Sequence, residues 1–306
     1  MAVEKPVALD ISACIALRGY AVAGASRYDP GYQFDPTPRS PFSMTIELYH
    51  AGMSVCSEKV RIQLAERDTP FISHALDLRA GDQQKPEYLK LNPNAVVPTI
   101  VHDGNVVIES NIILEYLAEV LPGTPLTTSS PLGRTKMRYW TKQLDEGLHQ
   151  LTSVISFAIG FRYQLLAKPR DEALKVLNKI PDPYRRDRQI DIYENGVASS
   201  HFAPAIRRFD KMLADMEKDL SKSPWLAGTD YSLADIAYTP YVNRLDQLQL
   251  AHMWDDRPKI ARWFDTVRAR PSFAKAYDGF MAKPVLDVMR EKGKEATAQV
   301  KGILAG

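Results

Sequence analysis

The sequence predicts an α/β half followed by an all-α half. Three observations support this prediction. Residues 45–121 alternate short strand-like runs with helix-like runs, whereas a helical period of apolar residues dominates from residue 137 onward. A proline-containing connection at 122–131 separates the two patterns. With 306 residues and 45% hydrophobic content, the chain has enough apolar material for a core in each of two domains.

The first half begins with a strand, a helix and a second strand. Residues 45–49 predict a short strand with Ile46 and Leu48 on one face, and 71–76 predict the next strand. Between them, 56–66 show the apolar spacing of an amphipathic helix. Because a helix joins the two strands, we expect parallel pairing with a right-handed crossover. The charged side chains of this helix are expected to lie largely outside: Glu58, Lys59, Arg61 and Glu66.

A hairpin and another helix complete this half. After a polar, helix-like stretch at 83–91, two short apolar runs at 99–101 and 106–108 flank an Asp-Gly pair, which is a strong hairpin signal. A helix over 110–121 follows and ends at a Pro-Gly pair. The order βαβ-α-ββ-α over residues 44–122 is typical of a thioredoxin-like domain.

The second half is predicted to be a helical domain spanning residues 131–283. Its start signals are clearest at Ser232, an N-cap candidate with Asp235 three residues later, and Tyr231 can pack across that cap. Asp235 is therefore interpreted as a structural cap and not as a catalytic acid. The strongest helical periods cover 137–166, 204–220, 233–245 and 259–270.

The two ends are expected to lie outside these domains. Residues 1–43 include a proline-rich stretch and a poor match to a secretory signal, which predicts a poorly ordered extension. Met44 stands directly before the first strand and is an alternative start of translation, which the intact mass of the native protein would settle. Residues 284–306 are rich in Lys and Glu and are expected to form a solvated helix or frayed tail.

Composition argues against several classes of protein. The 39 Lys and Arg nearly balance the 37 Asp and Glu, so the net charge of +2 indicates no nucleic-acid partner. The longest apolar runs fall short of the roughly 18 residues of a transmembrane helix, so no membrane partner is expected. The only cysteines, Cys14 and Cys56, have no metal-ligand spacing, which predicts no metal site and favours a reducing cytoplasm.

Ser54 is the first candidate for chemistry, because it follows a strand and precedes a helix. A thiolate bound there would meet unpaired N–H groups and the positive end of the helix dipole. Together with one hydroxyl donor, these supply the roughly 2.7 kcal/mol that lowers a thiol pKa by about two units. Ser57 is the alternative hydroxyl. Cys56 could act as a disulfide-exchange nucleophile, but its place in Ser-Val-Cys-Ser favours a side chain turned inward against the sheet.

Two further motifs suit a bound peptide. Val97-Pro98 precedes a strand, where a cis bond is plausible and the Val97 backbone can pair with an extended peptide. Glu109-Ser110 opens a helix: the Ser110 hydroxyl and N–H suit a carboxylate, while Glu109 can hold an ammonium. The headgroup of an α-amino acid presents both charges.

These motifs resemble those of the cytosolic glutathione transferases over residues 45–277. The resemblance implies a thioredoxin-like domain that binds glutathione, a helical domain that holds the electrophile, and usually a homodimer. It places Ser54 where the family has its thiolate-activating Ser or Cys. It also implies that Val97 pairs with the cysteinyl backbone of glutathione and that Glu109 and Ser110 hold the γ-glutamyl end. The motifs in question are Asn92-Pro93, Val97-Pro98, Glu109-Ser110, Glu115-Tyr116-Leu117 and Tyr231-Ser232-Leu233-Ala234-Asp235.

Within the family, residues 54–61 resemble a bacterial theta- or zeta-like branch, and the second half is similar to glutathione-dependent β-aryl etherases. One position departs from the zeta-like pattern. Where those enzymes carry a polar contact before Val-Pro, this chain has Ala95-Val96, so Asn94 is a candidate replacement. The etherase-like motifs are Trp140-Thr141-Lys142, Asp145-Glu146, Ile180-Pro181-Asp182-Pro183 and the Ser232 box.

The resulting expectation is a glutathione transferase in which Ser54 stabilises the thiolate of glutathione. The thiolate would attack a small apolar electrophile, an aryl ether among the candidates. Two alternatives stay open: a Cys56-dependent glutathione thioltransferase, and a non-catalytic adaptor that binds glutathione. Candidate residues for the electrophile wall are Met53, Tyr139, Phe157, Phe161, Arg162 and Tyr163.

Overall fold

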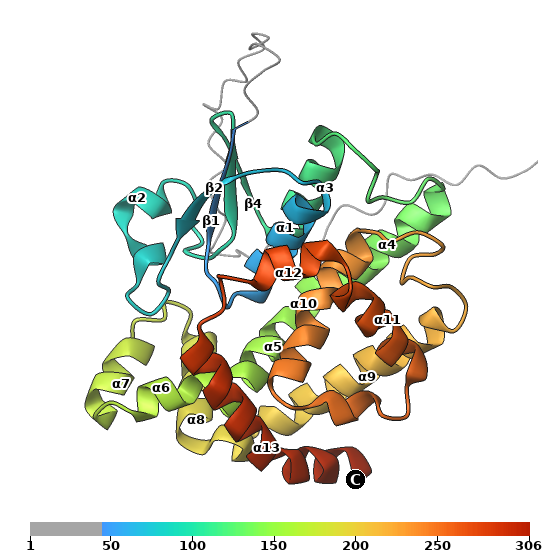
Figure 1. Ribbon diagram of the computed structural model, residues 1–306. Coiled ribbons are helices and arrows are strands. Elements are labelled where there is room, and N and C mark those ends of the chain that lie inside the picture. Colours follow the sequence, from blue (N-terminus) through green and yellow to red (C-terminus); the bar gives the residue numbers. More distant parts are fainter. Residues whose placement is uncertain (1–44) are drawn as a thin grey trace, which may run out of the picture. The chain divides into compact units, whose positions relative to one another are not determined.

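The computed structural model describes residues 45–306 (Figure 1). The expectations for residues 1–43, for Met44 as a start and for Cys14 lie outside the described residues. The described part packs as one compact unit, so the domain boundaries at 44–122 and 131–283 stay an interpretation of the sequence pattern.

A four-stranded sheet with the order β2-β1-β3-β4 forms the first half. Strands β1 and β2 pair in parallel across a crossover that contains α1, and β3 and β4 form an antiparallel hairpin. Both pairings confirm the prediction, as does the α/β class of this half. The elements are β1 (Ile46–His50), α1 (Val55–Glu66), β2 (Ile72–Ala75), η1 (Asp82–Gln84), α2 (Pro86–Leu89), β3 (Thr99–His102), β4 (Asn105–Ile108) and α3 (Ser110–Val120).

The rest of the described chain is helical, which confirms the all-α second half. The helical period predicted over 137–166 is confirmed, and it is divided among α4, α5 and α6 with a wider helical turn between successive helices. In the first of these turns Gly147, at φ +125°, interrupts the helical backbone. Helices α7 and α8 were not predicted. Helix α8 buries only Ile192 and Tyr193, which is too few residues to give a recognisable apolar period. The elements are α4 (Pro131–Gln143), η2 (Leu144–Leu148), α5 (His149–Ser156), η3 (Phe157–Phe161), α6 (Arg162–Leu166), α7 (Arg170–Leu177), α8 (Pro183–Asn195), η4 (Gly196–Ala198), α9 (Phe202–Leu220), α10 (Leu233–Gln247), η5 (Ala251–Trp254), α11 (Pro258–Arg268), α12 (Pro271–Tyr277) and α13 (Lys283–Ala305).

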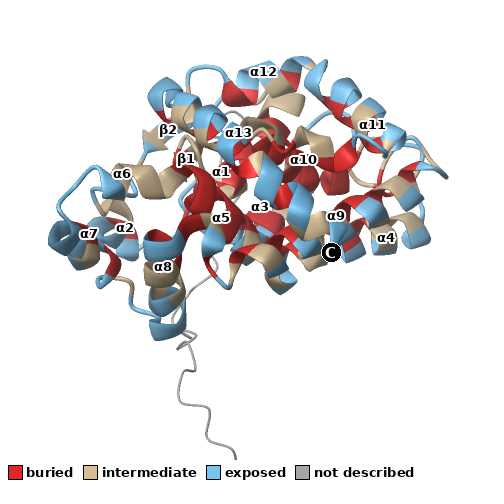
Figure 2. Ribbon diagram, turned by 90° about the horizontal axis from the view of Figure 1, so that it is seen from below, coloured by how far each residue is buried: buried red, intermediate tan, exposed pale blue. Residues whose placement is uncertain are grey.

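Helix α1 corrects one expectation from the sequence. Its charged residues were expected to face solvent, but Glu58, Lys59 and Arg61 are each at most 1% exposed. The reason is that α1 contacts α10 and α12 on the side away from the sheet, so both of its faces are covered (Figure 2). The charges that interrupt its apolar pattern therefore belong to a buried polar layer between the sheet and the helices.

The cap at the start of α10 has the structural role that was predicted for Asp235. This carboxylate is fully buried and accepts the N–H groups of Ser232 and Leu226, both at 3.0 Å, and the indole N–H of Trp263 at 2.9 Å. Burial raises the pKa of Asp235 to about 6, although the donors oppose that rise. Asp235 thus joins α10, the preceding loop and α11.

Residues 284–306 were expected to form a solvated helix or a frayed tail; they do form a helix, α13, but it is not solvated on all sides. One of its faces is buried, including Met289 and Gly293. A Cβ atom at Gly293 would come within 1.9 Å of the Leu248 carbonyl oxygen, and one at Gly160 would come within 2.6 Å of Met289 Cγ. Helix α13 therefore packs closely against the helical core. The abundance of Lys and Glu on its outer face masked this inner face in the sequence.

Candidate functional site

The predicted site residues converge on one edge of the sheet. Tyr49, near the end of β1, pairs with Thr99 at the start of β3, and Thr99 in turn pairs with Ile108 at the end of β4. The loop that enters α1, the Val97-Pro98 peptide that enters β3 and the start of α3 therefore meet at this edge. Three segments that are far apart in the sequence supply one site.

Ser54 is the N-cap residue of α1, and its side chain is half-buried. Its Oγ accepts the backbone N–H of Ser57 at 3.3 Å. Ser57 itself is fully buried, and its hydroxyl accepts the backbone N–H of Ala51 at 3.3 Å. The geometry therefore favours Ser54 over Ser57 as the hydroxyl that a ligand can reach.

The peptide bond between Val97 and Pro98 is cis. The loop before it is fixed by two donors to the Val96 carbonyl: the Tyr88 hydroxyl at 2.6 Å and the Asn92 amide at 2.9 Å. Asn94, the candidate replacement contact, lies in the same loop with an exposed side chain. This loop presents a rigid backbone next to the start of α1.

Glu109 and Ser110 differ in their surroundings. Glu109 is exposed and has φ +69°, a left-handed conformation that is strained for a residue other than glycine by about 1–3 kcal/mol. Such strain is typical of functional sites. Ser110 is the first residue of α3 and is only 7% exposed, and its Oγ accepts from Lys59 Nζ at 3.2 Å.

The buried Lys59 links the starts of α1 and α3. Besides Ser110, its ammonium donates to Asn111 Oδ1 at 3.0 Å, and the Asn111 amide donates to Asp145 Oδ1 at 2.9 Å. Burial lowers the pKa of Lys59, while the nearby Cys56 and Asp145 partly offset that effect. The sequence analysis placed Lys59 at the surface and so missed this cation.

Cys56 does not turn inward against the sheet, which corrects the expectation for its side chain. It is half-buried and packs against the helical core, with Sγ 3.5 Å from Nδ1 of His149 in α5. Burial alone raises the pKa of the thiol, but Lys59 and His149 outweigh it and lower the pKa to about 6. His149 also contacts the Tyr241 hydroxyl at 3.3 Å. His149 was missed because its contact with Cys56 depends on long-range packing.

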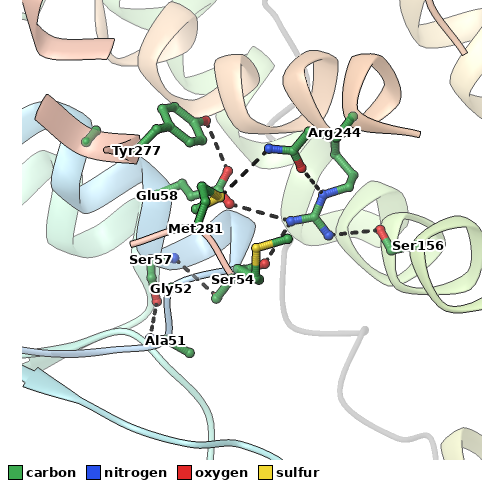
Figure 3. Close-up of polar contacts among 12 residues, drawn as sticks. Ala51, Gly52, Ser54, Ser57, Glu58, Ser156, Arg244, Tyr277 and Met281 are labelled. Atoms are coloured by element: carbon green, nitrogen blue, oxygen red, sulfur yellow. Dashed lines mark hydrogen bonds and ion pairs between the residues drawn. The ribbon is translucent and has the colours of Figure 1, made fainter. Parts of the chain in front are cut away.

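Two buried arginines hold the turn that precedes Ser54, and Figure 3 shows one of them, Arg244. Arg61 donates to the carbonyl oxygen of Gly52 at 2.8 Å, and Arg244 donates to that of Met53, also at 2.8 Å. Arg61 belongs to α1, whereas Arg244 comes from α10. The predicted thiol-activating residue thus sits on a turn whose backbone is fixed by both halves of the fold.

The predicted electrophile wall is only partly assembled near this turn. Met53 and Phe161 are both half-buried and pack against the helical core, and the Arg244 guanidinium lies 5.4 Å from the centre of the Phe161 ring. Phe157 is 8% exposed and belongs to the core itself. Met53 and Phe161 are therefore the better wall candidates.

The other wall candidates lie elsewhere. Arg162 and Tyr163 are half-buried neighbours, with the guanidinium 5.5 Å from the ring centre. Tyr139 is 63% exposed on α4. It lines a surface hollow of about 580 Å³ together with other residues of that helix and Ala227, none of which is a predicted site residue.

Two findings concern the described residues as a whole. Within residues 45–306, no group of three or more His, Cys, Asp or Glu side chains is arranged to hold a metal ion. Among the helices of this part of the chain, none has both the length and the apolar character needed to cross a bilayer.

The thioredoxin-like sheet carries a capping serine, a cis X-Pro peptide and a strained Glu-Ser pair at one edge, and a helical half follows it. This combination defines a glutathione transferase. Comparison with protein families agrees. The model of the glutathione S-transferase N-terminal domain matches residues 44–119, and that of the C-terminal domain matches residues 184–266. The chain belongs to the glutathione S-transferase family, whose members are enzymes that use glutathione as co-substrate.

Several bacterial and plant proteins are similar over most of the chain. Protein LigF from Sphingobium sp. is 31% identical over 81% of this chain and 99% of its own length. The crystal structure of the beta-etherase LigF has a TM-score of 0.68, covering 77% of this chain and 99% of that one. The tetrachloro-p-hydroquinone reductive dehalogenase of Sphingobium chlorophenolicum is 28% identical over 76% of this chain and 95% of its own length. Glutathione transferase F7 from Populus trichocarpa is 25% identical with a TM-score of 0.59, covering 78% of this chain and 100% of that structure.

Proposed function

We propose that Ser54 stabilises the thiolate of bound glutathione for attack on a small apolar electrophile. The observation that supports this most is the position of the Ser54 hydroxyl, which caps α1 beside the cis Val97-Pro98 peptide and the strained Glu109. A sulfur held at this helix start would receive a hydrogen bond from Ser54 and the favourable field of the helix.

The same edge suits the rest of the tripeptide. The Val97 backbone would pair with the cysteinyl unit in the manner of an added strand. The exposed Glu109 carboxylate would hold the α-ammonium of the γ-glutamyl end, and the N–H of Ser110 at the start of α3 would hold its carboxylate. The positive charge of Lys59, which lies beneath Ser110, adds to the attraction for that carboxylate.

An aryl ether is the electrophile that the comparisons favour, because LigF is described as a beta-etherase. In such a reaction the glutathione sulfur forms a bond to the carbon that carries the aryloxy group. The carbon–oxygen bond breaks, and its electron pair leaves with the phenolate, which takes a proton from water. The products are a glutathione thioether and a phenol.

The test is a binding and turnover experiment with the full chain. We expect calorimetry to detect glutathione binding with a Kd of about 1 mM or tighter. A panel of aryl ethers and aryl halides should then give at least one glutathione conjugate, identified by its mass. No uptake of glutathione would overturn the proposal, and binding without a rate gain on any electrophile would point to the non-catalytic adaptor.

A second candidate, a glutathione thioltransferase, is favoured by the contact between Cys56 and His149. With a pKa of about 6, the Cys56 thiol is mostly thiolate at pH 7. It would attack the sulfur of a mixed disulfide, release the substrate thiol and form a disulfide with glutathione. A second glutathione would free Cys56 and leave as glutathione disulfide.

The variant Cys56→Ala separates the two candidates in the same assay. If Ser54 is the working group, conjugation is expected to change less than about twofold. If Cys56 is the nucleophile, disulfide reduction is lost in the variant, and in the unmodified protein it declines as the pH falls through about 6, because the thiolate is protonated. Unchanged reduction in Cys56→Ala excludes the second candidate.

We also propose a homodimer that works in the cytoplasm. Helices α3 and α4 are joined by Arg138, which donates to both oxygens of Glu115 at 3.0 and 3.1 Å. Both helices expose apolar side chains: Ile112 is 59% exposed and Leu132 is 80% exposed. Light scattering of the purified protein should give twice the chain mass, and a monomer at micromolar concentration would contradict the dimer.

The cytoplasmic location rests on the small number of cysteines.

A further inference from the structure

We propose that Arg244 is a positioning residue for the Ser54 turn, and that it connects this turn to the helical wall where the electrophile would bind. The inference rests on the proposed role of Ser54. It concerns a residue of α10 that neither holds glutathione nor touches the reacting atoms.

The contacts of Arg244 are distributed over three parts of the fold (Figure 3). Its guanidinium donates to Gln247 Oε1 at 2.9 Å, to Ser156 Oγ at 3.3 Å and to the Met53 carbonyl at 2.8 Å. Glu58 Oε1 lies 3.5 Å from the same nitrogen that donates to Met53. With a side chain only 3% exposed, Arg244 is held from all sides in one orientation.

The Met53 carbonyl matters because it belongs to the peptide plane that ends at the nitrogen of Ser54. A peptide unit is planar, so fixing its carbonyl oxygen and its N–H fixes the plane. In this plane Arg244 holds the oxygen, and the N–H of Ser54 donates to the Ala51 carbonyl at 3.1 Å. The direction of the Ser54 side chain is set by this plane and by the start of α1.

Glu58 compensates the buried positive charge of Arg244, and it also contacts the Ser54 turn. An unpaired buried charge would cost several kcal/mol. Glu58 lies beside Arg244, accepts the Tyr277 hydroxyl at 3.0 Å and donates its own backbone N–H to the Ser54 carbonyl at 2.9 Å. Burial raises the pKa of Glu58, and Arg244 and Arg61 oppose that rise.

The other end of Arg244 faces the helical wall. Its guanidinium lies over Phe161 at 5.4 Å and bonds Ser156, the last residue of α5. A shift of this wall would therefore move the group that holds the Met53 carbonyl. The arrangement gives one side chain contact with both the wall and the serine turn.

The experiment measures the pKa of glutathione bound to the protein, from the ultraviolet absorbance of its thiolate and from the pH profile of kcat. In Arg244→Lys the positive charge is kept, but the fork of donors that reaches Met53, Ser156 and Gln247 together is lost. We expect the thiol pKa to rise by about one unit, from about 6.5 to about 7.5, so that the thiolate fraction and kcat at pH 7 fall about threefold, while the KM for glutathione changes less than about twofold.

Two further variants keep the inference testable. Ser156→Ala removes one hydrogen-bond acceptor of Arg244, and we expect it to raise the thiol pKa by less than Arg244→Lys does. This variant tests the inference if Arg244→Lys does not fold. The matched control is Arg257→Lys, because Arg257 also binds a carboxylate, Asp210 at 2.6 Å, and a carbonyl, that of Met253 at 2.9 Å, but it does not contact the Ser54 turn. The control should leave the thiol pKa unchanged.

The outcomes distinguish the inference from the proposed function. If the unmodified protein lowers the thiol pKa of glutathione and both Arg244→Lys and Ser156→Ala keep that low value, Arg244 has no positioning role and only the inference is overturned. A loss of thermal stability without a pKa change has the same meaning. If the unmodified protein leaves the thiol pKa at its free value, the role of Ser54 is overturned and the inference falls with it.

Discussion

Replacing Ser54 with alanine is expected to lower kcat by about 10- to 100-fold while the Kd for glutathione changes less than about threefold. The hydroxyl would donate to a charged sulfur, and a hydrogen bond to a charged group contributes about 1.5–3 kcal/mol. In the proposed site the rest of the tripeptide would be held by other groups, namely the Val97 backbone, Glu109 and Ser110, so affinity should be largely preserved. The apparent pKa of the bound thiol should rise in parallel with the loss of kcat.

The conservative control for this experiment is Ser54→Thr, which keeps a hydroxyl at the N-cap of α1. It should retain most of the turnover. Ser57→Ala is a second control, because the buried Ser57 hydroxyl accepts the backbone N–H of Ala51. This variant should lower the free energy of unfolding but leave the pKa of the bound thiol nearly unchanged. Equal losses of kcat and glutathione affinity in Ser54→Ala would contradict the assigned role.

The largest effect on stability is expected from Asp235→Ala. The carboxylate accepts the N–H groups of Leu226 and Ser232 and the indole of Trp263, all in the interior. The Ser232 hydroxyl also donates to it at 3.1 Å, so removing the carboxylate leaves four buried donors without their acceptor, and the free energy of unfolding should fall by about 3 kcal/mol or more. Urea denaturation measures this loss. Asp230→Ala, an exposed neighbour, should change stability by less than about 0.5 kcal/mol.

The pH dependence of this loss has a definite sign. Because burial raises the pKa of Asp235 from 3.8 to about 6, the folded state binds the proton more tightly than the unfolded state. The stabilising contribution of the side chain is complete below pH 3.8 and declines as the pH rises through about 6. The difference in stability between the unmodified protein and Asp235→Ala should therefore be larger at pH 4.5 than at pH 7. A larger difference at pH 7 would show that the donors outweigh burial.

Local sequence signals predicted much of the fold and of the site. The strand, helix and hairpin order, the Ser232 cap and the Val97-Pro98 edge each depend on a few neighbouring residues. Ser54 was placed correctly at a helix start for the same reason. Its role in chemistry stays a prediction.

Apart from the missed helices α7 and α8, the failures concern packing between distant segments. The charged residues of α1 predicted a solvated face, because no neighbouring residue in the sequence indicates that α10 and α12 cover it. For the same reason Lys59, His149 and Arg244 escaped notice, although each lies within hydrogen-bond or ion-pair distance of a predicted site residue or its turn. The inner face of α13 was hidden by the many Lys and Glu residues around it.

The close approach of α13 to the helical core has a consequence for how substrate preference can change. Gly160 precedes Phe161, a candidate residue of the electrophile wall, and leaves just enough room for Met289. A bulkier residue at position 289 would displace this stretch of backbone, and a smaller one would let it relax. Neither change replaces a residue of the proposed glutathione site. We therefore expect substitutions in α13 to change which electrophiles the proposed wall accepts and, because Arg244 lies over Phe161 and holds the Met53 carbonyl, to alter the Ser54 turn as well.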